Sequence, residues 1–455
     1  MSEFYTVNPT DGEQLAVYKT TSASALDQTI LAARSAQREW SALDTKQKMP
    51  YFEHLIAGLE KHKNKLARLI TLETGKTIIE SEAEVERCKI PLRYYIEHGE
   101  KLLSDEQIPT DAKKSYIRYE SIGLVASFTP SNYPLWGVFR QLAPALLCGN
   151  ALVIKGPNRI AGSLLSIIQI VANTGVPKGL VSAVFGNWKT AEQLISTVEL
   201  VVAVTSTQNA RKIGEIAGRH LKRTNFELSG SDPFIVLEDS DVELAAKKAV
   251  ASRLMNCGQD CVSAKRFIIK REVYGKFLAA FKIEIEKVKL GSPSNRQSSI
   301  GPLLSEQYIR FIETQLRDAV NNGANILVGG KRGTKKGNFF LPTILIGVSP
   351  KMRVWQEETF GPIAPIVQAS SDAEAVALAN NSPFGLGASI WTRDLRRGEF
   401  IAARLECGVV SINEQPKSNP AMPFGGVKLS GMGRDFSKYG LMHFLNTKSV
   451  QVFKQ

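Results

Sequence analysis

Apolar residues recur at helical spacing through the first hundred residues of the chain. Residues 23–43 and 46–76 place apolar side chains three or four positions apart, with charged residues between them. This periodicity predicts consecutive amphipathic helices over residues 24–104. Alternation at 115–120 then predicts an exposed strand, and the apolar run "GLVASF" at 123–128 predicts a buried strand that ends at a turn.

Buried strands and amphipathic helices alternate from residue 151 onwards. Three strand-like runs each precede a helical run, at 151–157, 181–186 and 200–206. This alternation predicts a parallel, doubly wound sheet, which binds ligands beyond the carboxyl ends of its strands. A second alternation, from about 233 to 413, predicts another α/β unit. The expected fold is therefore α/β, with two α/β domains and a small β element built from 113–121 and 447–453.

Length and composition are typical of a soluble globular protein. The 455 residues are 43% apolar and 22% charged, which fits two or three domains. No apolar run approaches the roughly 20 residues that cross a bilayer, so no membrane partner is expected. The first residues lack the pattern of a signal peptide, which favours a cytoplasmic location. Five cysteines are an odd and sparse set that does not suggest a disulfide framework.

The net charge of +13 could indicate a nucleic-acid surface or attraction for small anions. The densest basic run, "KRGTKK" at 331–336, is short and interrupted by glycine. A basic solvated surface, without a nucleic-acid partner, is therefore the favoured interpretation. Such a surface would also attract phosphorylated cofactors and carboxylate substrates.

Neither a nucleotide fingerprint nor a metal motif is apparent in the sequence. No G-x-G-x-x-G follows a strand, and no Walker A loop occurs, so a nucleotide would have to bind at strand ends and helix N-termini. The five histidines are scattered, at 54, 62, 98, 220 and 443. Cys257 and Cys261 supply only two of the four ligands of a structural zinc site. We therefore expect no metal.

The stretch "NCGQDC" at 256–261 suggests a single reactive thiol. A disulfide between its two cysteines is disfavoured at a helix-to-loop junction, and a lone cysteine is more often a small buried apolar residue. Glycine at 258 permits close backbone approach, and the polar neighbours are unusual at the end of a core helix. A thiolate in such surroundings can act as a nucleophile.

Two further segments carry candidate catalytic groups. "FELSGSDP" (226–233) puts Glu227 near a strand end, and "TPSNYP" (129–134) puts Asn132 in a turn bracketed by prolines. The carboxylate could serve as a base, and the amide could donate to an oxyanion. Each signal is weak by itself, because a glutamate before a turn is usually solvated and an asparagine between prolines usually serves the turn.

Together these segments resemble the aldehyde dehydrogenase superfamily over nearly the whole chain, from 7–13 to 430–450. The ordered landmarks are "TPSNYPLW", "VIKGPN", "GVPKGLV", "FELSGSDPFIVLEDSDVELA", "NCGQDCVSAKRFII", "EETFGP" and "PFGGVKLSGMGRD". The resemblance implies three regions, which are a cofactor-binding domain (1–112 and 122–229), a catalytic domain (230–430) and an oligomerisation element (113–121 and 445–455). It also implies a homodimer or a homotetramer.

The resemblance assigns catalytic roles to three residues. Cys261 is the implied nucleophile, whereas Cys257 occupies a variable position of the motif. Asn132 and the Cys261 backbone N–H form the implied oxyanion hole, and Glu227 is the implied general base. The presence of Glu227 argues against membership of the family branch in which coenzyme A, and not water, releases the acid from the thioester. Under oxidation, Cys257 could form a reversible disulfide with Cys261 and protect it.

Cofactor residues also follow from the resemblance. It assigns contacts with the dinucleotide to Lys155, Asn158, Ser206, Glu358 and Phe360. Many NAD-preferring members carry a glutamate where Asn158 stands, and losing that carboxylate removes repulsion against a 2′-phosphate. Arg159 could add attraction. We therefore predict that NADP is accepted as well as NAD, with a preference for NADP as a further possibility. The sequence "AVTST" at 203–207 lacks a family glycine beside the pyrophosphate.

The implied substrate is a short aldehyde with a carboxylate, most specifically succinate semialdehyde. Arg140 and Ser418 match the arginine and serine that bind this carboxylate in succinate-semialdehyde dehydrogenases, which are a branch of the family. A second arginine of some members is Met255 here. The alternatives are a broad-specificity aliphatic aldehyde dehydrogenase, a cysteine hydrolase that needs no nicotinamide, and a non-enzymatic role.

Overall fold

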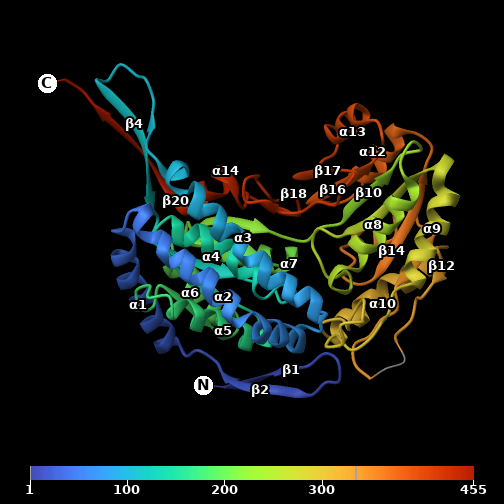
Figure 1. Cartoon of the computed structure of the whole chain (residues 1–455), viewed down its shortest axis with the longest axis horizontal. Helices are drawn as coiled ribbons and strands as arrows, with labels where there is room; N and C mark the ends of the chain where they lie inside the picture. The colour runs from blue at the N-terminus through green and yellow to red at the C-terminus, as the bar shows by residue number, and fades with distance from the viewer. Residues whose placement is uncertain (1, 334–335, 455) are drawn as a thin grey trace.

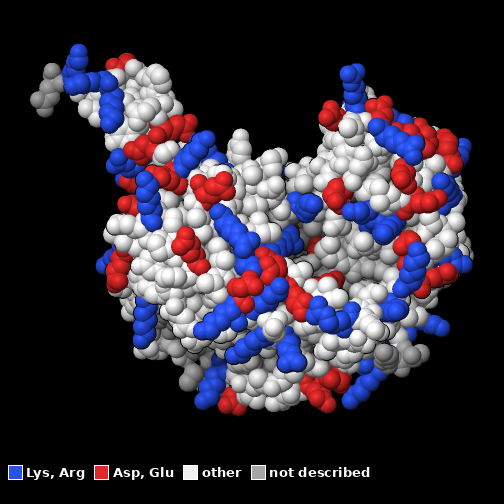
Figure 2. All heavy atoms as spheres, viewed as in Figure 1, with Lys and Arg blue, Asp and Glu red and all other residues white. Residues whose placement is uncertain are grey.

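The computed structural model describes residues 2–333 and 336–454. Residues 334 and 335 of the basic run, and the terminal residues 1 and 455, lie outside the described residues. The chain forms two lobes, each built around a sheet, and an arm of strands that projects from the first lobe (Figure 1). Lys and Arg side chains are intermingled with Asp and Glu on the face shown in Figure 2.

Three long helices open the first lobe, as the helical periodicity predicts. They are α1 (Ala23–Ser41), α2 (Thr45–Thr74) and α3 (Ile78–Leu103). Capping boxes begin the second and third of these, formed by Asp44 with Gln47 and by Thr77 with Glu80. A hairpin of β1 (Glu3–Val7) and β2 (Gln14–Lys19), which the sequence pattern did not predict, precedes them.

The first sheet has the strand order β19–β9–β8–β5–β6–β7, in which the edge strand β19 (Gly431–Met432) is antiparallel to β9. Its parallel strands are β5 (Leu124–Phe128), β6 (Ala151–Lys155), β7 (Val181–Val184), β8 (Leu200–Val204) and β9 (Arg223–Glu227). The connecting helices are α4 (Trp136–Leu147), α5 (Ala161–Ala172), α6 (Trp188–Thr197) and α7 (Thr207–Arg219). The strand order reverses between β5 and β8, and ligands bind at such a switch point.

The second sheet has the order β12–β13–β14–β11–β10–β16–β17. Its strands are β10 (Asp232–Val236), β11 (Ala264–Lys270), β12 (Asn325–Val328), β13 (Thr343–Ile346), β14 (Ile363–Ala369), β16 (Gly387–Trp391) and β17 (Val409–Ile412). Only the edge strand β12 pairs antiparallel in this sheet. The main helices of this lobe are α8 (Val242–Leu254), α9 (Tyr274–Glu286), α10 (Glu306–Asn321), α12 (Asp372–Asn380) and α13 (Leu395–Ala402).

The projecting arm joins two segments that lie far apart in the sequence. Strand β4 (Lys114–Ser121) pairs antiparallel with β20 (Leu445–Val452) over its whole length. This pairing confirms the predicted small β element, to which the short strand β3 (Glu106–Gln107) adds an edge. In Figure 1 the arm stands clear of both lobes.

Two buried hydrophobic clusters correspond to the two sheets. The first extends from Leu26 to Leu228 and also takes in side chains from the C-terminal segment, including Phe424, Phe436 and Phe444. The second comprises side chains between Phe234 and Ile401. The predicted fold of two α/β domains and a β element is therefore confirmed. Over residues 2–333 and 336–454, no helix is both long and apolar enough to cross a membrane.

Candidate active site

The carboxyl ends of the first sheet bring together four of the predicted site residues. Glu227 is the last residue of β9, and Lys155 is the last residue of β6. Asn132 lies just beyond β5, and Ser206 follows β8 as the N-cap of α7. Parallel strands end on the same edge of a sheet, so residues distant in sequence meet there.

The loop that carries Cys261 connects α8 to β11 through a run of left-handed backbone. The φ angles are 50° at Asn256, 56° at Cys257 and 77° at Gly258. Glycine suits the last position, since a Cβ there would collide with the Gly361 carbonyl. The Asn256 amide stabilises the turn by donating to the Asn132 carbonyl at 2.9 Å.

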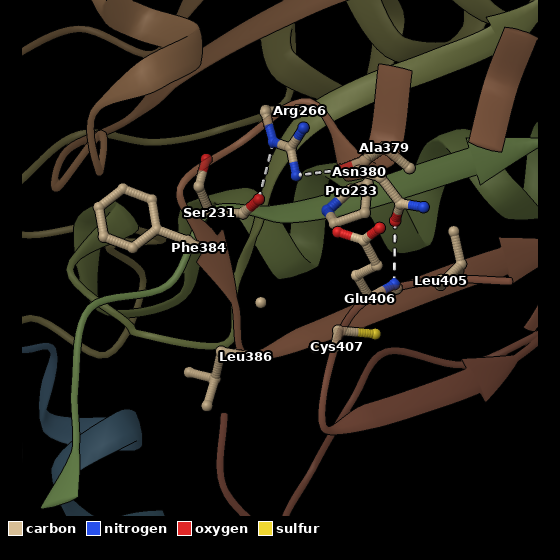
Figure 3. A pocket seen from close by; sticks show the side chains of 13 residues that line it. Ser231, Pro233, Arg266, Ala379, Asn380, Phe384, Leu386, Leu405, Glu406 and Cys407 are labelled. Carbon is tan, nitrogen blue, oxygen red and sulfur yellow. Dashed lines mark hydrogen bonds between the residues drawn. The ribbon is translucent and has the colours of Figure 1, made fainter. Parts of the chain in front are cut away.

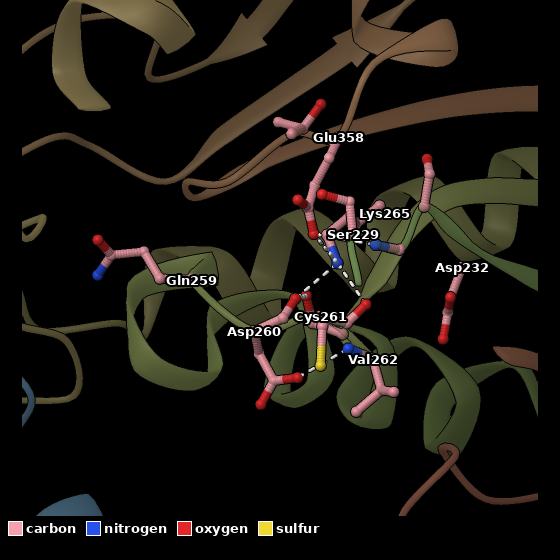
Figure 4. A network of polar contacts seen from close by, with 12 residues as sticks. Ser229, Asp232, Gln259, Asp260, Cys261, Val262, Lys265 and Glu358 are labelled. Atoms are coloured by element: carbon pink, nitrogen blue, oxygen red, sulfur yellow. Dashed lines mark hydrogen bonds and ion pairs between the residues drawn. The ribbon is translucent and has the colours of Figure 1, made fainter. Parts of the chain in front are cut away.

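Lys265, a fully buried residue of β11, holds the backbone of the same loop. Its Nζ donates to the carbonyl oxygens of Asp260 (2.6 Å) and Cys261 (2.8 Å), and lies 3.8 Å from Glu358 Oε1. Figure 4 shows the Cys261 sulfur on the side of the loop opposite Lys265. The lysine thus orients the backbone of the loop, while the thiol of the partly exposed Cys261 lies beside Glu227.

Asn132 and its neighbour Tyr133 anchor the loop from the first lobe. Asn132 Nδ2 donates to the Gln259 carbonyl at 2.8 Å, and the Tyr133 hydroxyl donates to Asp260 at 2.5 Å. A primary amide has two N–H donors, and the bond to Gln259 uses one. The other can serve an oxyanion formed at Cys261.

Glu227 is buried in a chain of charges with Arg140 and Asp435. Arg140 Nη1 lies 3.2 Å from Glu227 Oε2, and Nη2 lies 2.6 Å from Asp435 Oδ2. Burial raises the pKa of Glu227 to about 7; Arg140 and the neighbouring Cys261 thiol oppose this shift, while Asp435 adds to it. A carboxyl with a pKa near neutrality can take a proton and release it at physiological pH.

The two cysteines of the loop differ in their surroundings. Burial, together with the charges of Glu227 and Asp260, raises the pKa of the Cys261 thiol. Cys257 belongs to the hydrophobic core of the second lobe, and burial raises the pKa of its thiol as well. Both are free thiols. The predicted protective disulfide between them stays a prediction.

The predicted cofactor residues lie on both lobes. Burial lowers the pKa of Lys155, and the buried Asn158 Oδ1 has no hydrogen-bond partner among the described residues. Glu358 accepts from the Gly230 N–H at 3.1 Å, and Phe360 packs against Tyr308 with 5.5 Å between ring centroids. The Arg159 guanidinium donates to the Leu304 carbonyl at 2.7 Å.

The fit of this region to a dinucleotide rests on an unpaired buried acceptor and a helix N-terminus. Asn158 Oδ1 needs a donor, such as a ribose hydroxyl, to satisfy it. The α7 N-terminus, capped by Ser206, carries partial positive charge that suits a pyrophosphate. These features lie at the carboxyl ends of β6 and β8, where the strand pattern predicts a nucleotide site.

The two predicted substrate residues have different partners. Arg140 is buried between two carboxylates, whereas the Ser418 hydroxyl accepts a hydrogen bond from Arg87 Nη2 at 2.7 Å. Reasoning from the sequence missed Arg87, Lys265 and Asp435. The motif "GMGRD" contains the last of these but does not indicate its partner, and no motif marks Arg87.

Two cavities adjoin these elements. One, of about 280 Å³, lies beside the Cys261 loop and is lined by Arg87, Ile90, Met255, Asp260, Val262, Ser263, Gln415, Pro416, Lys417 and Ser418. The other, of about 10 Å³ beside Cys407, is shown in Figure 3. There Arg266 donates to the carbonyls of Ser231, Leu378 and Ala379, which uses three of its five N–H donors within the protein. Of these two cavities, the larger one has room for a substrate.

Comparison with known proteins agrees with this arrangement. The sequence model described as "Aldehyde dehydrogenase family" matches residues 1–450. The chain is 36% identical over 452 residues to a succinate-semialdehyde dehydrogenase [NADP(+)] of Deinococcus radiodurans, covering 99% of this chain and 95% of the relative. It is 35% identical to a succinate semialdehyde dehydrogenase [NAD(P)+] of Escherichia coli, covering 98% of this chain and 96% of the relative.

A solved structure extends the similarity to three dimensions. The crystal structure of an E. coli NADP-dependent enzyme superposes with a TM-score of 0.97 at 32% identity, covering 100% of this chain and 95% of that one. The match in sequence runs through every strand and loop that carries the site described above. The chain belongs to the aldehyde dehydrogenase family.

Proposed function

We propose that this protein oxidises succinate semialdehyde to succinate with NADP or NAD. The observation that carries the proposal is the placement of the Cys261 thiol beside the buried carboxylate of Glu227, with the Asn132 amide anchored to the same loop. The curated relatives named as succinate-semialdehyde dehydrogenases support the substrate, and their names support the two cofactors.

In the proposed mechanism, Glu227 takes the proton from the Cys261 thiol, and the thiolate attacks the aldehyde carbon. The oxygen becomes an alkoxide, which accepts hydrogen bonds from Asn132 Nδ2 and the Cys261 backbone N–H. A bound nicotinamide dinucleotide supplies the hydride acceptor that allows a thioester to form. After the Glu227 carboxyl has released the thiol proton to solvent, its carboxylate takes a proton from the water that attacks this thioester. The C–S bond then breaks, which frees the carboxylic acid product and regenerates the Cys261 thiolate.

The cofactor would be held by Lys155, Asn158, Ser206, Glu358 and Phe360. Asn158 leaves the site without the carboxylate that would repel a 2′-phosphate, which supports the use of NADP. Arg159 is engaged by the Leu304 carbonyl, so its predicted attraction for that phosphate requires the side chain to turn away from this partner.

The organisation predicted from the sequence is part of the proposal. We assign residues 1–112 and 122–229 to cofactor binding, 230–430 to catalysis, and the arm at 113–121 and 445–455 to oligomerisation, of which residues 1, 334, 335 and 455 lie outside the described part. The projecting, antiparallel arm supports assembly into a homodimer or a homotetramer. A cytoplasmic location stays a prediction.

The decisive experiment measures formation of reduced nicotinamide by the purified protein with a panel of aldehydes and both cofactors. We expect succinate semialdehyde to give the highest kcat/KM, and Cys261→Ala to abolish turnover. Equal or higher kcat/KM for uncharged aliphatic aldehydes would favour a broad-specificity aldehyde dehydrogenase. Ester hydrolysis without nicotinamide reduction on any aldehyde would favour a cysteine hydrolase.

A further inference from the structure

The larger cavity has the character of a binding site for a short, charged aliphatic molecule. Asp260 and Val262, which flank the nucleophile in sequence, form part of its wall. Met255 and Ile90 add apolar surface that suits a methylene chain. The volume of about 280 Å³ lies near the lower end of the range for small-molecule pockets, which suits a ligand of few atoms.

Two cationic side chains line the cavity. Arg87 extends from α3, and Lys417 extends from the loop that follows β17. The carboxylate in the same wall, Asp260, is engaged by the Tyr133 hydroxyl and by the Val262 N–H at 2.8 Å. The lining therefore combines apolar side chains with two cations and one carboxylate, whose hydrogen bonds are made within the protein.

Arg87 is held in place without losing its charge. Its guanidinium lies 4.2 Å from the centroid of the Trp136 ring, and Nη2 donates to the Ser418 hydroxyl at 2.7 Å. Both partners are uncharged, so they orient the guanidinium but do not neutralise it. An arginine has five N–H donors, and a carboxylate can accept two of them in parallel.

Arg140 is in the opposite situation. Its charge is shared between Glu227 and Asp435, and all three side chains are buried. If Arg140 turned to a substrate carboxylate, it would leave two buried carboxylates uncompensated, which is costly. The other family position for a cation is Met255, an apolar residue in the wall of the cavity.

We infer that Arg87, oriented by Trp136 and Ser418, is the residue that binds the carboxylate of the aldehyde substrate. This inference rests on the proposed function, because it concerns the same substrate class. Lys417 adds a second positive charge to the lining of the cavity. Arg140, in contrast, acts as a positioning residue for Glu227.

The test compares kcat/KM for a charged aldehyde with kcat/KM for an uncharged aldehyde. We would measure kcat/KM for succinate semialdehyde and for butanal, an uncharged aldehyde of the same length, in the parent and in Arg87→Gln. Losing a charged hydrogen bond to the carboxylate lowers the ratio of the first to the second by about 10- to 100-fold. The loss lies mainly in KM for the charged aldehyde. Arg87→Lys, which keeps the charge without the fork, gives an intermediate ratio and also serves if Arg87→Gln does not fold.

Two controls make the result specific. Arg93→Gln changes an exposed arginine of the same helix and leaves the ratio unaltered. Arg140→Gln lowers kcat for both aldehydes together. The inference is overturned if Arg87→Gln and Arg87→Lys keep the parental ratio, or if Arg140→Gln alone lowers it. A parent that prefers butanal would instead refute the proposed substrate, so the two failures are distinguishable.

Discussion

Arg140 Nη1 lies 3.2 Å from Glu227 Oε2, and both side chains are buried. The positive charge of Arg140 lowers the pKa of Glu227 and so opposes the effect of burial. In Arg140→Gln the pKa of Glu227 should rise by about 1 unit or more, because an opposite charge in contact typically shifts a carboxyl by 1–3 units. A smaller fraction of the protein then carries Glu227 as a carboxylate at neutral pH. The fall of kcat/KM on the acid side of the pH profile, its acid limb, therefore begins at a higher pH. Arg140→Lys, which retains the charge, should shift it less, and an unmoved limb in both variants would refute the positioning role.

Glu227 itself should determine the pH dependence of the parent. With its pKa at about 7, the carboxylate form that accepts protons is lost as pH falls through 7, and kcat/KM should fall with it. Glu227→Gln cannot take a proton, and we expect kcat to drop by roughly 10²- to 10⁴-fold with the acid limb abolished. A pH titration of both proteins measures this. A Glu227→Gln profile that keeps its inflection near pH 7 would assign the base to another group.

Asn132→Ala should lower kcat by about 10²- to 10³-fold, which is the usual cost of removing one oxyanion-hole donor. The same amide also holds the Gln259 carbonyl, so the loop could move instead. Asn256→Ala is the matched control, since it removes a different amide that also donates to the Gln259 carbonyl. If both variants lose kcat equally, the effect is on loop geometry and not on the oxyanion.

Asn158→Glu should shift cofactor use from NADP towards NAD. The added carboxylate would stand beside the 2′-phosphate of NADP, and like charges in contact cost several kcal/mol. We expect the ratio of kcat/KM for NADP to that for NAD to fall about tenfold or more, with Asn158→Gln close to the parent. A clear preference of the parent for NAD would contradict the role given to Asn158 in the use of NADP, and this can be measured without any variant.

Asp232 provides a test through stability. One oxygen accepts from the Gly387 N–H at 3.0 Å, while Oδ2 is buried and has no hydrogen-bond partner among residues 2–333 and 336–454. Burial raises its pKa from 3.8 to about 7, although Lys265 and Arg266 oppose the shift. A raised carboxyl pKa gives stability that is complete below pH 3.8 and is lost as pH rises through 7, up to about 4 kcal/mol.

Asp232→Asn removes this titration. We therefore expect the free energy of unfolding of the variant minus that of the parent to be larger at pH 8 than at pH 5, which means that the variant gains relative stability as pH rises. Denaturant unfolding at the two pH values measures the difference. If the difference between variant and parent is the same at both, Asp232 does not titrate between them.

Local patterns were sufficient to predict much of the fold. The helices of 23–103 and the strands that end at Lys155 and Glu227 follow from periodicities that depend only on neighbouring residues. The two-residue strand β19 (Gly431–Met432) is too short to show any periodicity, and the pattern did not predict it.

The site was less accessible to sequence reasoning, because its contacts join distant segments. Arg87 and Ser418 are 331 positions apart in the sequence, and only the fold brings them into contact. The Arg140–Asp435 pair likewise joins α4 to the C-terminal segment. Motif resemblance indicated Cys261, Glu227 and Asn132. It did not reveal that two buried carboxylates already neutralise the charge of Arg140.

The pairing of β19 with β9 has a consequence for biosynthesis. Gly431 pairs with Glu227, and the Ser430 hydroxyl donates to the Ser229 carbonyl at 2.6 Å. Asp435 follows directly and completes the contacts of Arg140. A ribosome therefore adds Cys261 to the chain 174 residues before it adds Asp435, which holds Arg140 beside Glu227. During translation at about 5–20 residues per second, the nascent chain carries Cys261 for roughly 10 to 35 seconds before Asp435 is made and can hold Arg140 beside Glu227.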